Sequence, residues 1–405
     1  MPLLMSRNIL RVLRLFLIIA GVAIVLWAID WSDSIQIPAG EPGLDGVVLE
    51  QPRVYEVTGV MPTHEDSDVI SCLLFGAPVS VADVPVAWYR PGIFTLLGQA
   101  SLGLLLLGLL PLAGVYPLQA TRWWILMRCR GLAVSWWRTL RLVFVGAFFN
   151  FCLPGTEGGD VVKAWYVAKQ SDDRVIAVMS VVFDRITGLL GLIVLAAVAG
   201  VMATSGSVAF TIGLWAWGVI AVIAIFAWMY FNAGLRTWLG LERLQRLFGG
   251  GLIARIEDAA HAYGVHKRSV TFATLISVVV QILLASAATL AGVSLGITHD
   301  PALILTVMPI LFLAAAVPMS WQGIGVMEGL GILLLAMPDF ATPNQVIGML
   351  LIYRGYELSW SLIGSLMLLR GDIHLHPERH QGAGEAVKPG SEGDLQADSG
   401  TMRQS

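Results

Sequence analysis

The sequence predicts an all-α polytopic membrane protein with about six full transmembrane helices, two re-entrant broken hairpins arranged as candidate inverted repeats, and a small strand-rich extracytoplasmic insert. Of its residues, 56% are hydrophobic and only 13% are charged, whereas about a quarter of the residues of a soluble domain are charged. Several apolar runs of about 20 residues are each long enough to cross about 30 Å of hydrocarbon. The mean hydropathy of +0.75 agrees with a chain that lies largely in a membrane.

The first unit, residues 1–29, is predicted to be an N-terminal transmembrane anchor. An apolar run at 15–29 follows Arg7, Arg11 and Arg14, and no small-x-small cleavage site follows it. Basic residues beside a span favour the cytoplasmic side, so we expect an uncleaved helix with a cytoplasmic N-terminus.

The second unit, residues 30–92, is predicted to be an acidic extracytoplasmic insert. It contains ten acidic residues against Arg53 and Arg90, without a basic cluster that would retain it in the cytoplasm. The stretches 46–60 and 70–81 are rich in β-branched residues and bounded by Gly and Pro, which is typical of short strands.

A transmembrane domain is predicted over residues 93–370. Its first span covers about 93–117, and the segment 118–141 that follows has five arginines, four tryptophans and no acid. Arginines reach lipid phosphates and tryptophans favour the headgroup layer, so this segment is expected to be interfacial on the cytoplasmic face.

Four further spans are expected at about 175–203, 208–231, 269–295 and 344–369. Residues 232–268 have six basic residues against three acids and are predicted to form amphipathic cytoplasmic surface helices. The tail, 371–405, has few aliphatic residues and is predicted to be disordered and cytoplasmic.

Two apolar segments, 142–168 and 302–337, are interrupted. Every basic segment lies on the cytoplasmic side only if both segments are re-entrant or both cross the membrane. We prefer the re-entrant topology because residues 142–155 are too short to cross and the second segment is broken at its midpoint.

The two breaks share a pattern of residue types. "LPGTEGGD" (153–160) and "VPMSWQGIG" (317–325) each contain a proline, then a hydroxyl two residues later, then a pair of glycines. The two segments would enter from opposite faces, as inverted repeats do. The matching residues are Pro154, Thr156, Gly158 and Gly159 in the first break, and Pro318, Ser320, Gly323 and Gly325 in the second; Gly155 is a further glycine of the first break.

Such breaks are tolerated at membrane depth where they are buried in protein or line a watery cavity. Proline ends a helix, and glycine lets a ligand or a second backbone approach closely. Thr156 or Glu157 would cap a new helix near Gly158, with Lys163 one turn inside it. A helix N-terminus beside a lysine suits a phosphate headgroup; the alternative is a kinked hairpin that only packs tightly.

Ionisable residues within the spans are candidate site residues, because burying one costs about 2.5–3.5 kcal/mol on insertion scales. Asp184 and Arg185 lie in the third span, Arg354 and Glu357 share one face of the last helix, and Glu328 follows the second break. Two interpretations stay open: structural ion pairs, Asp184 with Arg185 and Arg354 with Glu357, or ligands for a phosphate and carriers of a proton.

These segments together resemble the lysylphosphatidylglycerol synthase/flippase membrane-domain family. The resemblance runs from about residue 93 to 370, and "FFNFCLPGTEGGD" is its most specific part. It implies a helical domain with re-entrant segments that moves lipids between leaflets. The motif positions are Asn150, Pro154, Gly155, Gly158, Gly159, Asp160, Asp184, Arg185, Pro318, Gly323, Gly325, Glu328 and Arg354. Two departures are the acidic insert and the lack of an aminoacyl-transferase domain after the last span, so lysyl-lipid synthesis is not expected.

The leading functional hypothesis is an ATP-independent flippase in the inner membrane that moves a phosphate-bearing, anionic lipid. The sequence has no G-x-x-x-x-G-K-[ST] motif, and its three cysteines lie far apart, so neither nucleotide hydrolysis nor a metal or other cofactor is expected. Membrane lipids are the expected partners, and nucleic acid is not. Two alternatives stay open: a membrane transferase acting on a phospholipid or polyprenyl lipid, and a non-catalytic partner of a lipid-biosynthesis enzyme.

Overall fold

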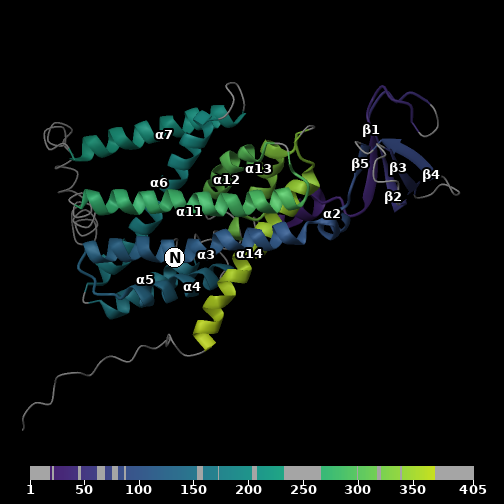
Figure 1. Cartoon of the computed structure of the whole chain (residues 1–405). Helices are drawn as coiled ribbons and strands as arrows, with labels where there is room; N and C mark the ends of the chain where they lie inside the picture. The colour runs from purple at the N-terminus through teal and green to yellow at the C-terminus, as the bar shows by residue number, and fades with distance from the viewer. Residues whose placement is uncertain are drawn as a thin grey trace, which may run out of the picture.

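The computed structural model consists of a helical body with a small β-sheet at one end (Figure 1). It describes residues 19–20, 22–43, 47–61, 69–74, 81–85, 88–152, 158–171, 173–202, 208–231, 266–298, 300–316, 321–337 and 340–369. The predicted amphipathic helices at 232–265, the start of the anchor and the tail after residue 369 lie outside these residues.

The insert is an antiparallel five-stranded sheet in the order β4-β3-β2-β1-β5. The prediction that this segment is strand-rich is therefore confirmed. Ile35, Ile37 and Val57 are buried and form its core. Its strands are β1 (Asp33–Ile37), β2 (Arg53–Met61), β3 (Val69–Leu74), β4 (Val81–Pro85) and β5 (Tyr89–Arg90).

The sheet is attached to the helical body where the chain enters and leaves it. The Asn344 side chain accepts a hydrogen bond from Asp30 N at 3.0 Å and donates to Asp30 O at 2.9 Å and Pro91 O at 3.1 Å. The Asp33 carboxylate accepts a further bond from Gly92 N at 2.7 Å. The two ends of the insert are thus held together at the start of the last helix.

Long apolar helices make up the body. Three of them, α3, α6 and α11, are long and apolar enough to cross a membrane among the described residues. Helices α3 and α11 pack along their lengths (Figure 1). The short helix α2 (Ile93–Gln99) precedes α3. The long helices are α3 (Leu102–Cys129), α6 (Arg174–Met202), α7 (Val208–Phe231), α11 (Lys267–Ser294) and α14 (Pro343–Leu369).

The boundaries predicted for the second span were wrong. Instead of one span at 93–117 and an interfacial segment at 118–141, α3 continues to Cys129 and the chain turns at Gly131, where φ is +74°. Within the predicted interfacial segment, Trp123 is buried and donates a hydrogen bond to Ser180 Oγ at 3.2 Å, whereas Trp137 is exposed. The position of this segment at the membrane interface stays a prediction.

Each interrupted segment is a pair of packed helices around a break. The first is α4 (Trp136–Cys152) and α5 (Gly158–Gln170). The second is α12 (Pro301–Ala316), the 3-10 turn η2 (Trp321–Gly323) and α13 (Val326–Leu335). In the second break the backbone is left-handed at Gln322 (φ +53°), Gly323 (+71°) and Gly325 (+85°). Re-entrance and the entry face of each pair stay predictions.

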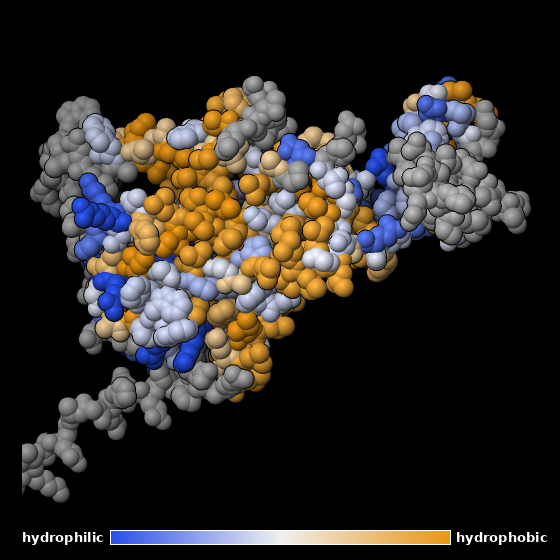
Figure 2. Space-filling view, viewed as in Figure 1, coloured by the Kyte–Doolittle hydropathy of each residue, from blue (hydrophilic) through white to orange (hydrophobic). Residues whose placement is uncertain are grey.

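Apolar residues cover the middle of the face in Figure 2, and hydrophilic residues gather near the helix ends and on the sheet. Large apolar side chains such as Leu106, Trp215 and Leu333 are exposed on the helices. A soluble monomer rarely exposes so much contiguous apolar surface, so this protein belongs in a lipid bilayer.

Candidate polar cavity

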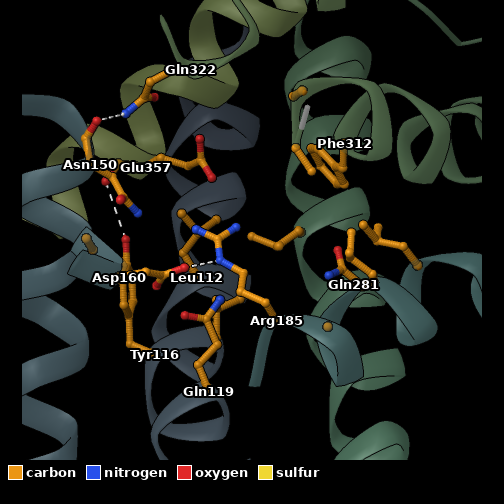
Figure 3. Close-up of a pocket in the computed structure, with 18 of the residues that line it drawn as sticks. Leu112, Tyr116, Gln119, Asn150, Asp160, Arg185, Gln281, Phe312, Gln322 and Glu357 are labelled. Carbon is orange, nitrogen blue, oxygen red and sulfur yellow. Dashed lines mark hydrogen bonds and ion pairs between the residues drawn. The ribbon is translucent and has the colours of Figure 1, made fainter. Parts of the chain in front are cut away.

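A cavity of about 300 Å³ lies where the two broken segments meet α3, α6, α11 and α14 (Figure 3). Apolar and neutral polar side chains line it together with seven charged ones. The charged lining residues are Arg122, Lys163, Arg185, Arg354, Asp160, Asp184 and Glu357.

The first turn of α5 lies directly against α4. A Cβ on Gly159 would overlap the carbonyl oxygen of Gly146, so this approach requires glycine. Asn150 Oδ1 also accepts a hydrogen bond from Gly159 N at 2.8 Å. This bond satisfies one of the N–H groups that a helix start leaves unpaired. The "FFN…GGD" pattern therefore sets the packing of the two helices of the first hairpin.

Asp160 gathers two cations at the edge of the cavity. Its carboxylate forms an ion pair with Lys163 Nζ at 2.9 Å and a second ion pair with Arg185 Nε (Figure 3). The Lys163 and Asp160 side chains are 11% and 12% exposed, whereas that of Arg185 is 38% exposed. Because one carboxylate is shared by two cations, this cluster has a net positive charge. The cluster reaches the molecular surface through the partly exposed side chain of Arg185.

Asp184 pairs with Arg122 rather than with its neighbour Arg185. Arg122 Nε lies 2.7 Å from Asp184 Oδ1, and Arg122 Nη1 donates to Ser277 Oγ at 2.9 Å. The predicted pairing of Asp184 with Arg185 was wrong, because adjacent residues on a helix point in different directions.

Arg354 also has a different partner from the one predicted. Its Nε and Nη2 lie 3.2 and 3.0 Å from Glu328 Oε1, and its Nη1 donates to Gln322 O at 2.7 Å. Glu328 is buried behind the cavity, and its other oxygen accepts Gly325 N at 2.7 Å as part of a capping box. The pairing of Arg354 with Glu357 was wrong, since the second hairpin supplies a closer carboxylate.

Glu357 differs from the other carboxylates at the cavity. Its carboxylate accepts a hydrogen bond from Tyr353 Oη at 2.9 Å. Among the described residues it forms no ion pair with a lysine or arginine. In Figure 3 it points into the cavity.

A hydrogen bond links the two hairpins across the cavity. Gln322 Nε2 donates to Asn150 O at 2.9 Å (Figure 3). Because Gln322 O also accepts a bond from Arg354, this one residue connects the first hairpin, the second hairpin and α14.

The structure brings most of the predicted site residues together. Asn150, Asp160, Lys163, Asp184, Arg185, Arg354 and Glu357 line the cavity. Gly158 begins α5, and Gly159, Gly323, Gly325 and Glu328 support the cavity from behind it. Pro154, Gly155, Thr156, Pro318 and Ser320 lie outside the described residues.

Sequence reasoning missed several lining residues, chiefly Arg122, Gln119, Gln281, Gln322 and Tyr353. Arg122 was missed because it lies in the arginine- and tryptophan-rich segment 118–141, whose arginines were all interpreted as contacts to lipid phosphates. Gln119 and Gln281 did offer a signal, since a polar residue within an apolar span is costly and often functional. Among the described residues, no group of three His, Cys, Asp or Glu side chains could hold a metal ion.

A comparison with protein-family models matches residues 79–364 to the family described as the lysylphosphatidylglycerol synthase TM region. The match extends from just before β4 into α14 and includes every helix that lines the cavity. No curated protein matches the chain.

Proposed function

Because the chain belongs to the lysylphosphatidylglycerol synthase transmembrane-region family, we propose that it is an ATP-independent flippase for a phosphate-bearing, anionic lipid. It would work in the inner membrane with both termini in the cytoplasm, without a catalytic step or a cofactor. Its partners would be the membrane lipids themselves.

The observation that supports this proposal most strongly is the charged cavity between two broken hairpins. Charged residues within a bilayer are costly and usually face one another or a water-filled space, so seven charged side chains around one cavity favour a pathway for a polar group. The cations outnumber the carboxylates in the lining, and the surplus lies at Lys163 and Arg185 beside Asp160. A phosphate between these two cations would form charge-assisted hydrogen bonds with both.

The dimensions of the cavity favour a headgroup rather than a whole lipid. About 300 Å³ is at the low end for a small-molecule pocket, so the acyl chains would stay in the bilayer beside the apolar helices. In transporters built from inverted repeats, one half rocks against the other around a site near the midplane. Here the bond between Gln322 and Asn150 would break and re-form as the two hairpins move.

The test is translocation in proteoliposomes that contain the full chain, with labelled anionic, zwitterionic and cationic phospholipids. The wild type should move the anionic lipid preferentially. Arg185→Gln should slow that movement about tenfold or more, equivalent to about 1.4 kcal/mol of lost transition-state stabilisation. Asp160 keeps Lys163 as its partner in this variant, so its carboxylate does not lose both of its cations.

Arg174→Gln is the matched control, because Arg174 is exposed at the start of the same helix. It should transport the lipid at the wild-type rate. If folded wild-type protein moves none of the three lipid classes, the flippase proposal is wrong and the enzyme and partner alternatives gain support. Equal rates for Arg185→Gln and wild type would refute the assignment of the site.

A further inference from the structure

The three other carboxylates at the cavity each have a cationic partner. Asp160 has Lys163 and Arg185, Asp184 has Arg122, and Glu328 has Arg354. Glu357 alone, among the described residues, has no direct ion pair: it accepts a hydrogen bond from the neutral hydroxyl of Tyr353, and Arg354 attracts it from one turn away on α14. Resting on the flippase function proposed above, we propose that Glu357 binds a proton whenever an anionic headgroup enters the cavity, so that lipid and proton cross the membrane together.

The groups around Glu357 define its electrostatic environment. Tyr116 and Arg122 face the cavity from α3, Asp160 and Lys163 from α5, and Asp184 and Arg185 from α6. On its own helix Glu357 has Tyr353 and Arg354, and Glu328 lies behind Arg354 on α13. The described lining residues of α4, α11, α12 and η2 include no titratable side chain; they contribute neutral groups such as Asn150, Gln281, Phe312 and Gln322.

Arg354, one turn away on the same helix, is the cation that acts on Glu357, and Lys163 and Arg185 line the same cavity. A phosphate that binds Arg185 and Lys163 would repel an ionised Glu357 carboxylate, because the two anions would share one small space. Interactions of this kind are much stronger in a low-dielectric interior than in water. Protonation of Glu357 removes the repulsion.

Coupling of this type is reciprocal. If the headgroup favours protonation of Glu357, protonation must favour binding of the headgroup by the same factor.

Tyr353 donates its hydrogen bond to Glu357 Oε1, so the other carboxylate oxygen is the one that accepts the proton. The proton comes from water on the face where the headgroup enters and returns to water on the opposite face. One phosphodiester anion and one proton together transfer no net charge.

The experiment uses proteoliposomes with labelled phosphatidylglycerol, whose phosphodiester stays ionised at neutral pH, and an imposed pH gradient at zero membrane potential. Wild type should enrich the lipid in the leaflet that faces the alkaline compartment, by about tenfold for each pH unit at one proton per lipid. Glu357→Gln, which has a neutral side chain of the same shape, should leave equal amounts of labelled phosphatidylglycerol in the two leaflets. Protein-free vesicles give the background redistribution to subtract.

If wild-type protein moves the lipid but leaves equal amounts of it in the two leaflets under the pH gradient, proton coupling is overturned and the flippase proposal stands. The absence of any protein-dependent movement would overturn both. Enrichment by Glu357→Gln equal to that of the wild type would show that the proton binds elsewhere, and would refute the role of Glu357.

A binding measurement separates coupling from transport. The affinity of the detergent-solubilised full chain for short-chain phosphatidylglycerol should fall as the pH rises from 5 to 8, because ionised Glu357 opposes the phosphate. Glu357→Gln should bind equally at every pH. Tyr353→Phe retains the carboxylate and should retain the pH dependence. A pH dependence in Glu357→Gln equal to that of the wild type would contradict the proposal.

Discussion

At the scale of single residues, three arginines at the cavity are neutralised by carboxylates from other helices, whereas Glu357 forms no direct ion pair among the described residues. Arg122 on α3 meets Asp184 on α6, Arg185 on α6 meets Asp160 on α5, and Arg354 on α14 meets Glu328 on α13. Each pair therefore fastens two helices together as well as placing a charge near the headgroup site. The structure therefore supports an ion-pair role for these charges, and their role in binding a headgroup stays a proposal.

This ion-pair role has a consequence for stability at Arg354. Glu328 is only 2% exposed, so Arg354→Met should leave a buried, unpaired carboxylate and cost about 3–5 kcal/mol of unfolding free energy. Adding Glu328→Gln removes that charge while its amide oxygen can still cap Gly325 N. The double variant should recover most of the loss, as measured by thermal unfolding in detergent. A double variant no more stable than Arg354→Met would mean that the pair is not the source of the stability.

Sequence reasoning identified most of the charged residues but not their partners. The identities follow from the cost of a charge in an apolar span, which can be recognised one residue at a time. The partners depend on how helices far apart in the chain pack, and spacing along one helix cannot reveal this. Arg354 and Glu357 share a helix face, yet Arg354 pairs with Glu328 because the second hairpin is held against α14.

At the scale of elements, the hairpins depend on close backbone contacts that only glycine permits. Gly159 contacts Gly146 between α4 and α5, and Gly364 of α14 lies against the backbone of Phe144 on α4. Packing of small residues is the usual way that helices approach closely within a membrane. These contacts position Asn150, Asp160 and Lys163 along the cavity.

Gly159→Ala should therefore force α4 and α5 apart. Overpacking of this kind costs about 1–3 kcal/mol, and the shift should also displace Asp160 and reduce transport. Gly329→Ala is the matched control: Gly329 lies in α13 of the other hairpin, where a Cβ meets open space. That change should stabilise the helix by about 0.5–1 kcal/mol. Similar thermal stabilities for the two variants would contradict the packing argument.

The positions of proline and glycine predicted where the two interrupted segments are broken, because these residues end and turn helices through local backbone geometry. Helix ends were predicted less well. The sequence ended the second span near residue 117, whereas α3 continues to Cys129, because arginine and tryptophan do not by themselves end a helix. The predicted strand stretches, 46–60 and 70–81, did not include β1, which begins with Asp33 and Ser34, or β5, which has only two residues.

At the scale of the whole molecule, the cavity exists only because segments from all parts of the helical body converge. Asn150 and Gln322 are 172 positions apart and are joined by one hydrogen bond. The sequence could suggest two similar broken segments, and a resemblance to a lipid-handling family, which the family comparison confirms. It could not predict that both segments face one space, because that depends on the packing of four other helices, α3, α6, α11 and α14, around them.

The central claim is that this one cavity is reached by a lipid headgroup from both faces of the membrane. Ala147 lines the cavity from α4, and Ala133 is exposed in the turn before α4. Each can be changed to cysteine in a chain whose three native cysteines are replaced by serine. Transport by both variants is checked first.

The measurement is the rate of modification by a membrane-impermeant thiol reagent, added to either side of vesicles with and without phosphatidylglycerol. The account predicts that Ala147→Cys reacts from both sides and that the anionic lipid slows both reactions, while Ala133→Cys reacts from one side only and is unaffected by the lipid. Reaction of Ala147→Cys from a single side, at a rate that the lipid does not change, would contradict the account.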